Sequence, residues 1–259
     1  MIYFILIAGY VLLADAVAKY GEQRNIGYNA AFLISVFMSP AIGFVFARSS
    51  SKLEKDSGRD VMLESAGDSY SLEMTRVAGI MLCINMLMFA FEIWAYRNGL
   101  ISEVNAMSLS SGVGFMPHQL ISHLFIHGSV SHIYSNLCCL LLCGASVERL
   151  IGSGRFLAVY LIGGIIGAAL QMSLRMAPGD SMLGASGCIY AIATLFAITD
   201  NSHFRNIKWL KMRYFVLPGI VYELTKILSP KDGVAHLAHI GGISVAVLFY
   251  FIFIWKRSR

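Results

Sequence analysis

Long apolar runs alternate with short polar segments along most of the chain. A helix that spans a bilayer needs about 20 mostly apolar residues, and several runs approach that length. The first two are Met1–Ala18 and Tyr28–Ala47. The six that follow are Val77–Tyr96, Leu120–Ser146, Phe156–Met176, Leu183–Thr199, Tyr214–Leu228 and Val234–Trp255. This pattern predicts an all-α fold, a polytopic bundle of membrane-spanning helices.

A polar segment divides the chain between its second and third apolar runs. Residues 48–76 are dense in Ser, Lys, Glu, Asp and Arg. We therefore predict three parts: an N-terminal transmembrane hairpin at 1–47, a polar cytoplasmic linker at 48–76, and a six-helix core at 77–259.

The composition is typical of a chain that lies largely within a lipid bilayer. It is 57% hydrophobic and 14% charged, whereas a soluble domain carries roughly 25% charged residues. The net charge is +5, but no basic stripe is interleaved with aromatic residues, so nucleic acid is excluded as an expected partner. Clusters of Lys and Arg at alternate ends of the core helices predict that both termini are cytoplasmic.

A serine and a histidine stand out on the fourth and sixth core segments. Ser186 lies in the sequence Gly184-Ala185-Ser186-Gly187, and His239 is followed by Gly241-Gly242. The orientation places both near the outer ends of their helices. The small residues would let the helices approach until the hydroxyl and the imidazole meet, as nucleophile activation requires. The alternative is that Ser186 only packs and His239 is a structural hydrogen-bonding residue.

The surroundings of this pair predict a dyad. Tyr190 lies four residues after Ser186, so it shares the same helical face and its ring can contact the imidazole. Asp180, Asp200 and Asp232 lie in predicted loops. No acid is therefore expected to complete a triad.

A histidine-rich segment supplies candidates for an oxyanion site. His132 and Asn136 are four residues apart and share a helical face. On one continuous helix, His127 would lie about 140° away from His132, so His123 and His127 are expected to hold the neighbouring loop by hydrogen bonds. A metal site is the alternative, but these spacings scatter the ligands. We expect no metal and no cofactor.

These motifs together resemble the rhomboid family of intramembrane serine proteases over roughly Val77 to Trp255. The resemblance implies a six-helix bundle with a water-filled cavity open to the outer face. It also implies cleavage of transmembrane protein substrates near the outer membrane boundary. Carried over, Ser186 is the nucleophile, His239 the general base and Tyr190 its support. His132 and Asn136 join the oxyanion hole. Glu148 and Gly152 match the structural turn after the second core helix.

The sequence also departs from the family pattern. The outer loop carries Pro117-His118-Gln119, where the family often has Trp, so the resemblance does not extend to the membrane anchoring of this loop. A non-catalytic factor that binds membrane proteins or controls their quality is the alternative function. The expected location is a bacterial inner membrane, with lipid and transmembrane substrates as partners.

Overall fold

The computed structural model divides the chain into two compact units. One consists of Met1–Glu73 with Asn201–Met212, and the other of Met74–Asp200 with Arg213–Arg259. The residues that the structure describes are 13, 16–17, 19–21, 31, 35, 44, 47–48, 75–199, 203–204, 207–226 and 233–255. The predicted N-terminal hairpin and polar linker lie almost wholly outside the described residues. The division into hairpin, linker and core therefore stays a prediction.

The described part of the first unit contains one small antiparallel sheet. Strand β3 (His203–Phe204) pairs with β4 (Ile207–Lys211). These strands fall between the fourth and fifth predicted core helices.

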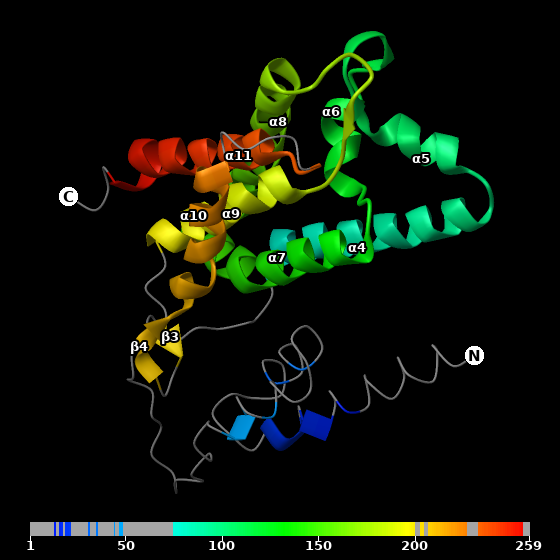
Figure 1. The fold of residues 1–259 in the computed structure, drawn as a ribbon. Helices are drawn as coiled ribbons and strands as arrows, with labels where there is room; N and C mark the ends of the chain where they lie inside the picture. Colours follow the sequence, from blue (N-terminus) through cyan, green and yellow to red (C-terminus); the bar gives the residue numbers. More distant parts are fainter. Residues whose placement is uncertain are drawn as a thin grey trace, which may run out of the picture. The chain divides into compact units, whose positions relative to one another are not determined.

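The second unit is built almost entirely from helices (Figure 1). They are α4 (Arg76–Arg97), α5 (Ile101–Met107), α6 (Gln119–Ser122), α7 (Val130–Ile151), α8 (Ser153–Leu174), α9 (Ser186–Thr199), α10 (Leu217–Lys226) and α11 (His236–Phe249). A π-helical segment, Tyr250–Ile254, continues α11, and short 3₁₀ turns occupy Gly112–Gly114, His123–Phe125 and Met212–Phe215. Among the described residues, α4, α7, α8 and the continuous helix His236–Ile254 are long and apolar enough to cross a membrane. The all-α membrane bundle is confirmed.

The predicted span Leu120–Ser146 was wrong as a single helix. It is interrupted after the turn His123–Phe125, and α7 begins only at Val130. Ser129 ends the interruption as an N-cap, because its hydroxyl accepts a hydrogen bond from the backbone N–H of His132 at 3.2 Å. His123 and His127 consequently precede α7 rather than lying along it.

Glycines allow α8 and α11 to pack backbone against backbone. A Cβ on Gly241 would lie 2.4 Å from the Cα of Gly167, and one on Gly167 would lie 2.2 Å from the carbonyl oxygen of Ala238. Figure 1 shows α11 beside α8 and α9. Contacts this close exclude side chains, as is typical of helices that pack in lipid.

The carboxylate of Glu148, near the end of α7, caps the N-terminus of α4. Glu148 accepts hydrogen bonds from the backbone N–H groups of Val77 at 3.0 Å and Ala78 at 2.7 Å. It also accepts bonds from the hydroxyls of Thr75 and Ser153. These contacts satisfy backbone donors that a helix leaves free at its first turn, and they fix α4, α7 and α8 at one end.

A short antiparallel sheet precedes the serine helix. Strand β1 (Leu109–Ser110) pairs with β2 (Ser181–Met182), with Leu109 opposite Met182. The chain then runs from β2 through Gly184 into α9. The sheet therefore ties the loop after α5 to the segment that leads to Ser186.

Candidate active site

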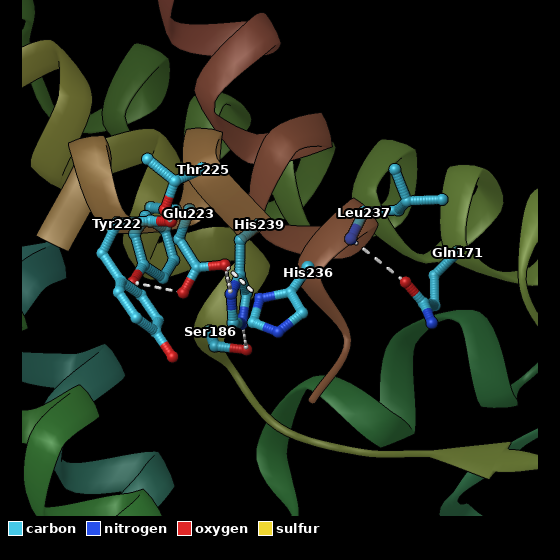
Figure 2. Close-up of polar contacts among 9 residues, drawn as sticks. Gln171, Ser186, Tyr222, Glu223, Thr225, His236, Leu237 and His239 are labelled. Carbon is cyan, nitrogen blue, oxygen red and sulfur yellow. Dashed lines mark hydrogen bonds and ion pairs between the residues drawn. The ribbon is translucent and has the colours of Figure 1, made fainter. Parts of the chain in front are cut away.

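Ser186 and His239 form a hydrogen bond across two helices. Ser186 is the first residue of α9, and His239 lies in the first turn of α11. The Ser186 Oγ lies 2.8 Å from Nε2 of His239 (Figure 2). His239 is only 7% exposed. The two side chains thus have the separation at which a base can take the proton of a hydroxyl.

The two glycines near His239 pack against two different helices. Gly242 lies against the carbonyl group of Gly187, so it brings α11 to the serine helix as the sequence indicated. Gly241 instead lies against Gly167 of α8. The expectation that both glycines serve the approach to α9 is therefore corrected for Gly241.

Tyr190 stacks on the imidazole. The centroids of the Tyr190 and His239 rings are 4.4 Å apart, and the ring planes are inclined by 25°. The Tyr190 hydroxyl donates a hydrogen bond to Oε1 of Glu223 at 3.0 Å. One tyrosine therefore contacts both the histidine and an acid from α10.

Glu223 is the residue that the sequence analysis missed. Its side chain is buried, and its Oε2 lies 2.7 Å from Nδ1 of His236 and 2.9 Å from Nδ1 of His239 (Figure 2). The first is a hydrogen bond, whereas the His239 contact is short without the alignment of a regular hydrogen bond. The expectation that no acid lies near the imidazole was wrong.

Glu223 lies inside the fifth apolar segment, whereas the aspartates considered from the sequence lie in predicted loops. An ionisable residue inside such a segment usually faces protein or a water cavity and has a partner there. That signal was available from the sequence, but the sequence does not show which residue Glu223 contacts.

His127 and Asn136 lie together, contrary to the expectation for a continuous helix. The Asn136 Nδ2 donates to Nε2 of His127 at 3.0 Å, and the rings of His127 and His132 are 5.2 Å apart between centroids. Burial, with a smaller effect of His132, lowers the pKa of His127 to about 4. This imidazole is therefore neutral near pH 7, as an acceptor for the amide must be.

His132 lies against the segment that leads into α9. A Cβ on Gly184 would lie 2.4 Å from Cε1 of the His132 ring. Gly184 also has a φ of +119°, which disfavours any other residue, and its N–H donates to the carbonyl of His123 at 2.8 Å. The His132 ring thus lies beside the segment that leads to Ser186.

His123 and His127 hold the loop before α7, as expected. The His123 ring contacts the carbonyl of Gln119 through Nδ1 at 2.5 Å. The backbone N–H of His127 donates to both carboxylate oxygens of Glu92, at 2.9 and 3.0 Å. Glu92, on α4, is buried, so this contact anchors the loop to the first core helix.

One group of side chains has the composition of a metal site. Glu223, His236 and His239 each offer one ligand atom, and these atoms lie within 4.8 Å of one another. Two imidazoles and a carboxylate form a donor set that suits zinc. This group differs from the histidines that raised the metal alternative in the sequence, and its members are joined by one hydrogen bond and one ion pair.

Apolar helices around a partly buried serine–histidine pair define the class: a polytopic membrane protein with a candidate active site among its helices. A family model described as the Rhomboid domain matches residues 115–256. Because this match covers more than half of the chain, the chain belongs to the rhomboid family. It is an integral membrane protein, and the matched range contains Ser186, His239 and Glu223.

Individual relatives carry protease names. The chain is 32% identical over 138 residues to "Rhomboid protease GlpG" of Haemophilus influenzae, covering 51% of this chain and 67% of the relative. It is 30% identical over 131 residues to "Rhomboid-type serine protease 2" of Emericella nidulans, covering 50% of this chain. The matched part spans only 25% of the length of that fungal relative.

Proposed function

We propose that the chain is an intramembrane serine endopeptidase that cleaves transmembrane protein substrates near the outer membrane boundary. The observation that carries this proposal is the 2.8 Å contact between Ser186 Oγ and His239 Nε2. The names of the relatives support the same activity. A factor that only binds membrane proteins would have no need of this contact.

In the proposed reaction, Ser186 and His239 act as nucleophile and general base. Nε2 takes the Oγ proton while Oγ attacks the carbonyl carbon of the scissile bond. His239 then passes that proton to the leaving amine, and an acyl-enzyme remains on Ser186. Water attacks the ester through the same base, which releases the carboxylic product and restores the hydroxyl.

The negative oxygen that forms during attack requires hydrogen-bond donors. We assign this role to the Asn136 amide, the His132 ring and the backbone N–H of Ser186. Ser186 begins a helix of 14 residues, and the N-terminus of a helix favours negative charge. Tyr190 supports His239 through ring stacking.

The membrane arrangement is part of the proposal. Basic residues between the core helices favour a cytoplasmic location for both termini, in a bacterial inner membrane. Ser186 and His239 would then lie near the outer surface, where a substrate helix meets water. Lipid surrounds the apolar outer faces, including Leu87 and Trp94, whose side chains are exposed on α4.

The test of this function is Ser186→Ala. The full chain in detergent is incubated with a model transmembrane substrate, and labelling by a fluorophosphonate is measured alongside. Cleavage and labelling should both disappear while thermal stability is kept, since only a hydroxyl is lost. Ser244→Ala is the matched control, because Ser244 is exposed on α11 and its hydroxyl donates to the carbonyl of Ile240 at 2.8 Å. Cleavage by a folded Ser186→Ala protein would contradict the proposal.

A further inference from the structure

We propose that Glu223 is a positioning residue for His239, so that the site works as a Ser186–His239–Glu223 relay rather than as an isolated pair. This inference rests on the proposed function. It adds a role for α10, the helix that carries Glu223, in the reaction of residues on α9 and α11.

The imidazole lies between the serine and the acid. Nε2 of His239 faces Ser186 Oγ at 2.8 Å, and Nδ1, on the other side of the ring, lies 2.9 Å from Oε2 of Glu223 (Figure 2). A proton on Nδ1 faces the carboxylate favourably. Nε2 then keeps the lone pair that accepts the serine proton. The carboxylate thereby selects the tautomer that the reaction needs.

The position of the carboxylate is itself fixed by two further side chains. Oε1 accepts from the hydroxyl of Tyr190 at 3.0 Å, and Oε2 contacts Nδ1 of His236 at 2.7 Å. Only 3% of Glu223 is exposed, and a buried carboxylate needs such partners to be stable. Two donors, one from α9 and one from α11, therefore hold Glu223 beside the imidazole.

Charge on the histidine is the second effect of this contact. When His239 takes the serine proton it becomes an imidazolium, and a carboxylate at 2.9 Å stabilises that cation. The other titratable groups that face this cluster include Tyr190 from α9, His132 and Cys139 from α7, Tyr222 from α10 and His236 from α11. In this described surrounding, Glu223 supplies the negative charge nearest to Nδ1.

A purely structural role is the competing explanation. The same bonds also fasten α10 to α9 and α11, so loss of Glu223 could simply loosen the bundle. The two roles differ in one measurable respect. Loss of a purely structural residue lowers the stability of the protein, whereas loss of a positioning residue changes kcat and the dependence of the reaction on pH.

Glu223→Gln tests the relay in the full chain. It keeps the shape of the side chain and removes the charge. We expect kcat to fall at least about tenfold with little change in KM; loss of the corresponding acid costs about 10,000-fold in a soluble serine protease. We also expect the acidic limb of the kcat/KM profile to move to lower pH, because the imidazolium loses its counter-charge. Glu103→Gln is the control, since Glu103 is exposed on α5 and accepts a hydrogen bond from the hydroxyl of Ser102 at 2.8 Å.

Glu223→Asp is the second variant. It keeps the charge but withdraws it by one methylene, so kcat should fall while the acidic limb stays near its wild-type position. A folded Gln or Asp variant with wild-type kcat and pH profile would overturn the relay. Fluorophosphonate labelling of wild-type Ser186 separates the two proposals. If the wild type is neither labelled nor active, the proposed function has failed rather than the role of Glu223.

Discussion

Gly187 and Gly242 bring the serine helix and the histidine helix into backbone contact. A Cβ on Gly242 would lie 2.1 Å from the carbonyl oxygen of Gly187. Because backbone atoms cannot rotate away, Gly242→Ala should push α11 from α9 and lengthen the Ser186–His239 contact. We expect destabilisation of about 1–3 kcal/mol and a clear loss of cleavage, measured by thermal unfolding and a substrate assay.

Gly154→Ala is the matched control for that substitution. Gly154 lies in the first turn of α8, and nothing lies within 4 Å of a Cβ built there. Alanine should be tolerated or slightly stabilising at this site, because it favours a helix more than glycine does. Equal activity of the two alanine variants would show that the close approach of α9 and α11 is unnecessary.

The two histidines at the start of α11 should differ in importance. His239→Ala should be essentially inactive, since removal of the base in a soluble serine protease costs about a million-fold in kcat. His236→Ala should keep a substantial share of activity, because His236 contacts Glu223 and not Ser186. Fluorophosphonate labelling of Ser186 should follow the same order. The reverse order would require a different register of α11 against α9.

Asn136→Ala and His132→Ala should lower kcat more than they raise KM. These side chains are proposed to bind charge that develops only during attack. Loss of one oxyanion donor costs about 100- to 1000-fold in a soluble protease, and a shared site should cost less. Steady-state kinetics on a transmembrane substrate provides the measurement. If kcat is unchanged in both variants, the two residues are structural.

Excess EDTA should leave cleavage unchanged, since the proposed reaction uses only side chains and water. The measurement is the cleavage rate before and after chelation, with Zn²⁺ added back. A reversible loss that Zn²⁺ restores would direct attention to Glu223, His236 and His239, whose ligand atoms have suitable spacing.

The sequence predicted those parts of the site that depend on local spacing. Ser186 and Tyr190 share a helical face, and the glycines around Ser186 and His239 indicated a close helix crossing. Helix periodicity and residue size determine both features, so a single sequence contains them. The same reasoning also predicted long apolar helices at α4, α8 and α11.

Other features depend on contacts between distant segments. Glu223 meets His239 only because α10 packs on α11, and the spacing of residues in the sequence does not indicate which helices pack together.

The position of His127 was missed for a local reason. The sequence Gly128-Ser129 interrupts the apolar run, and Ser129 is a residue type that begins helices. Attention to that signal would have separated His127 from α7.

The contact of Glu148 with the start of α4 constrains the order of assembly in the membrane. During synthesis α4 emerges before α7. The N–H groups of Val77 and Ala78 therefore cannot bond to Glu148 until the chain has grown by 70 or more further residues. Insertion of α4 therefore cannot draw on this contact. Instead, the contact stabilises the second stage, in which inserted helices associate. A defect at Glu148 should thus leave a chain that is correctly inserted but loosely assembled.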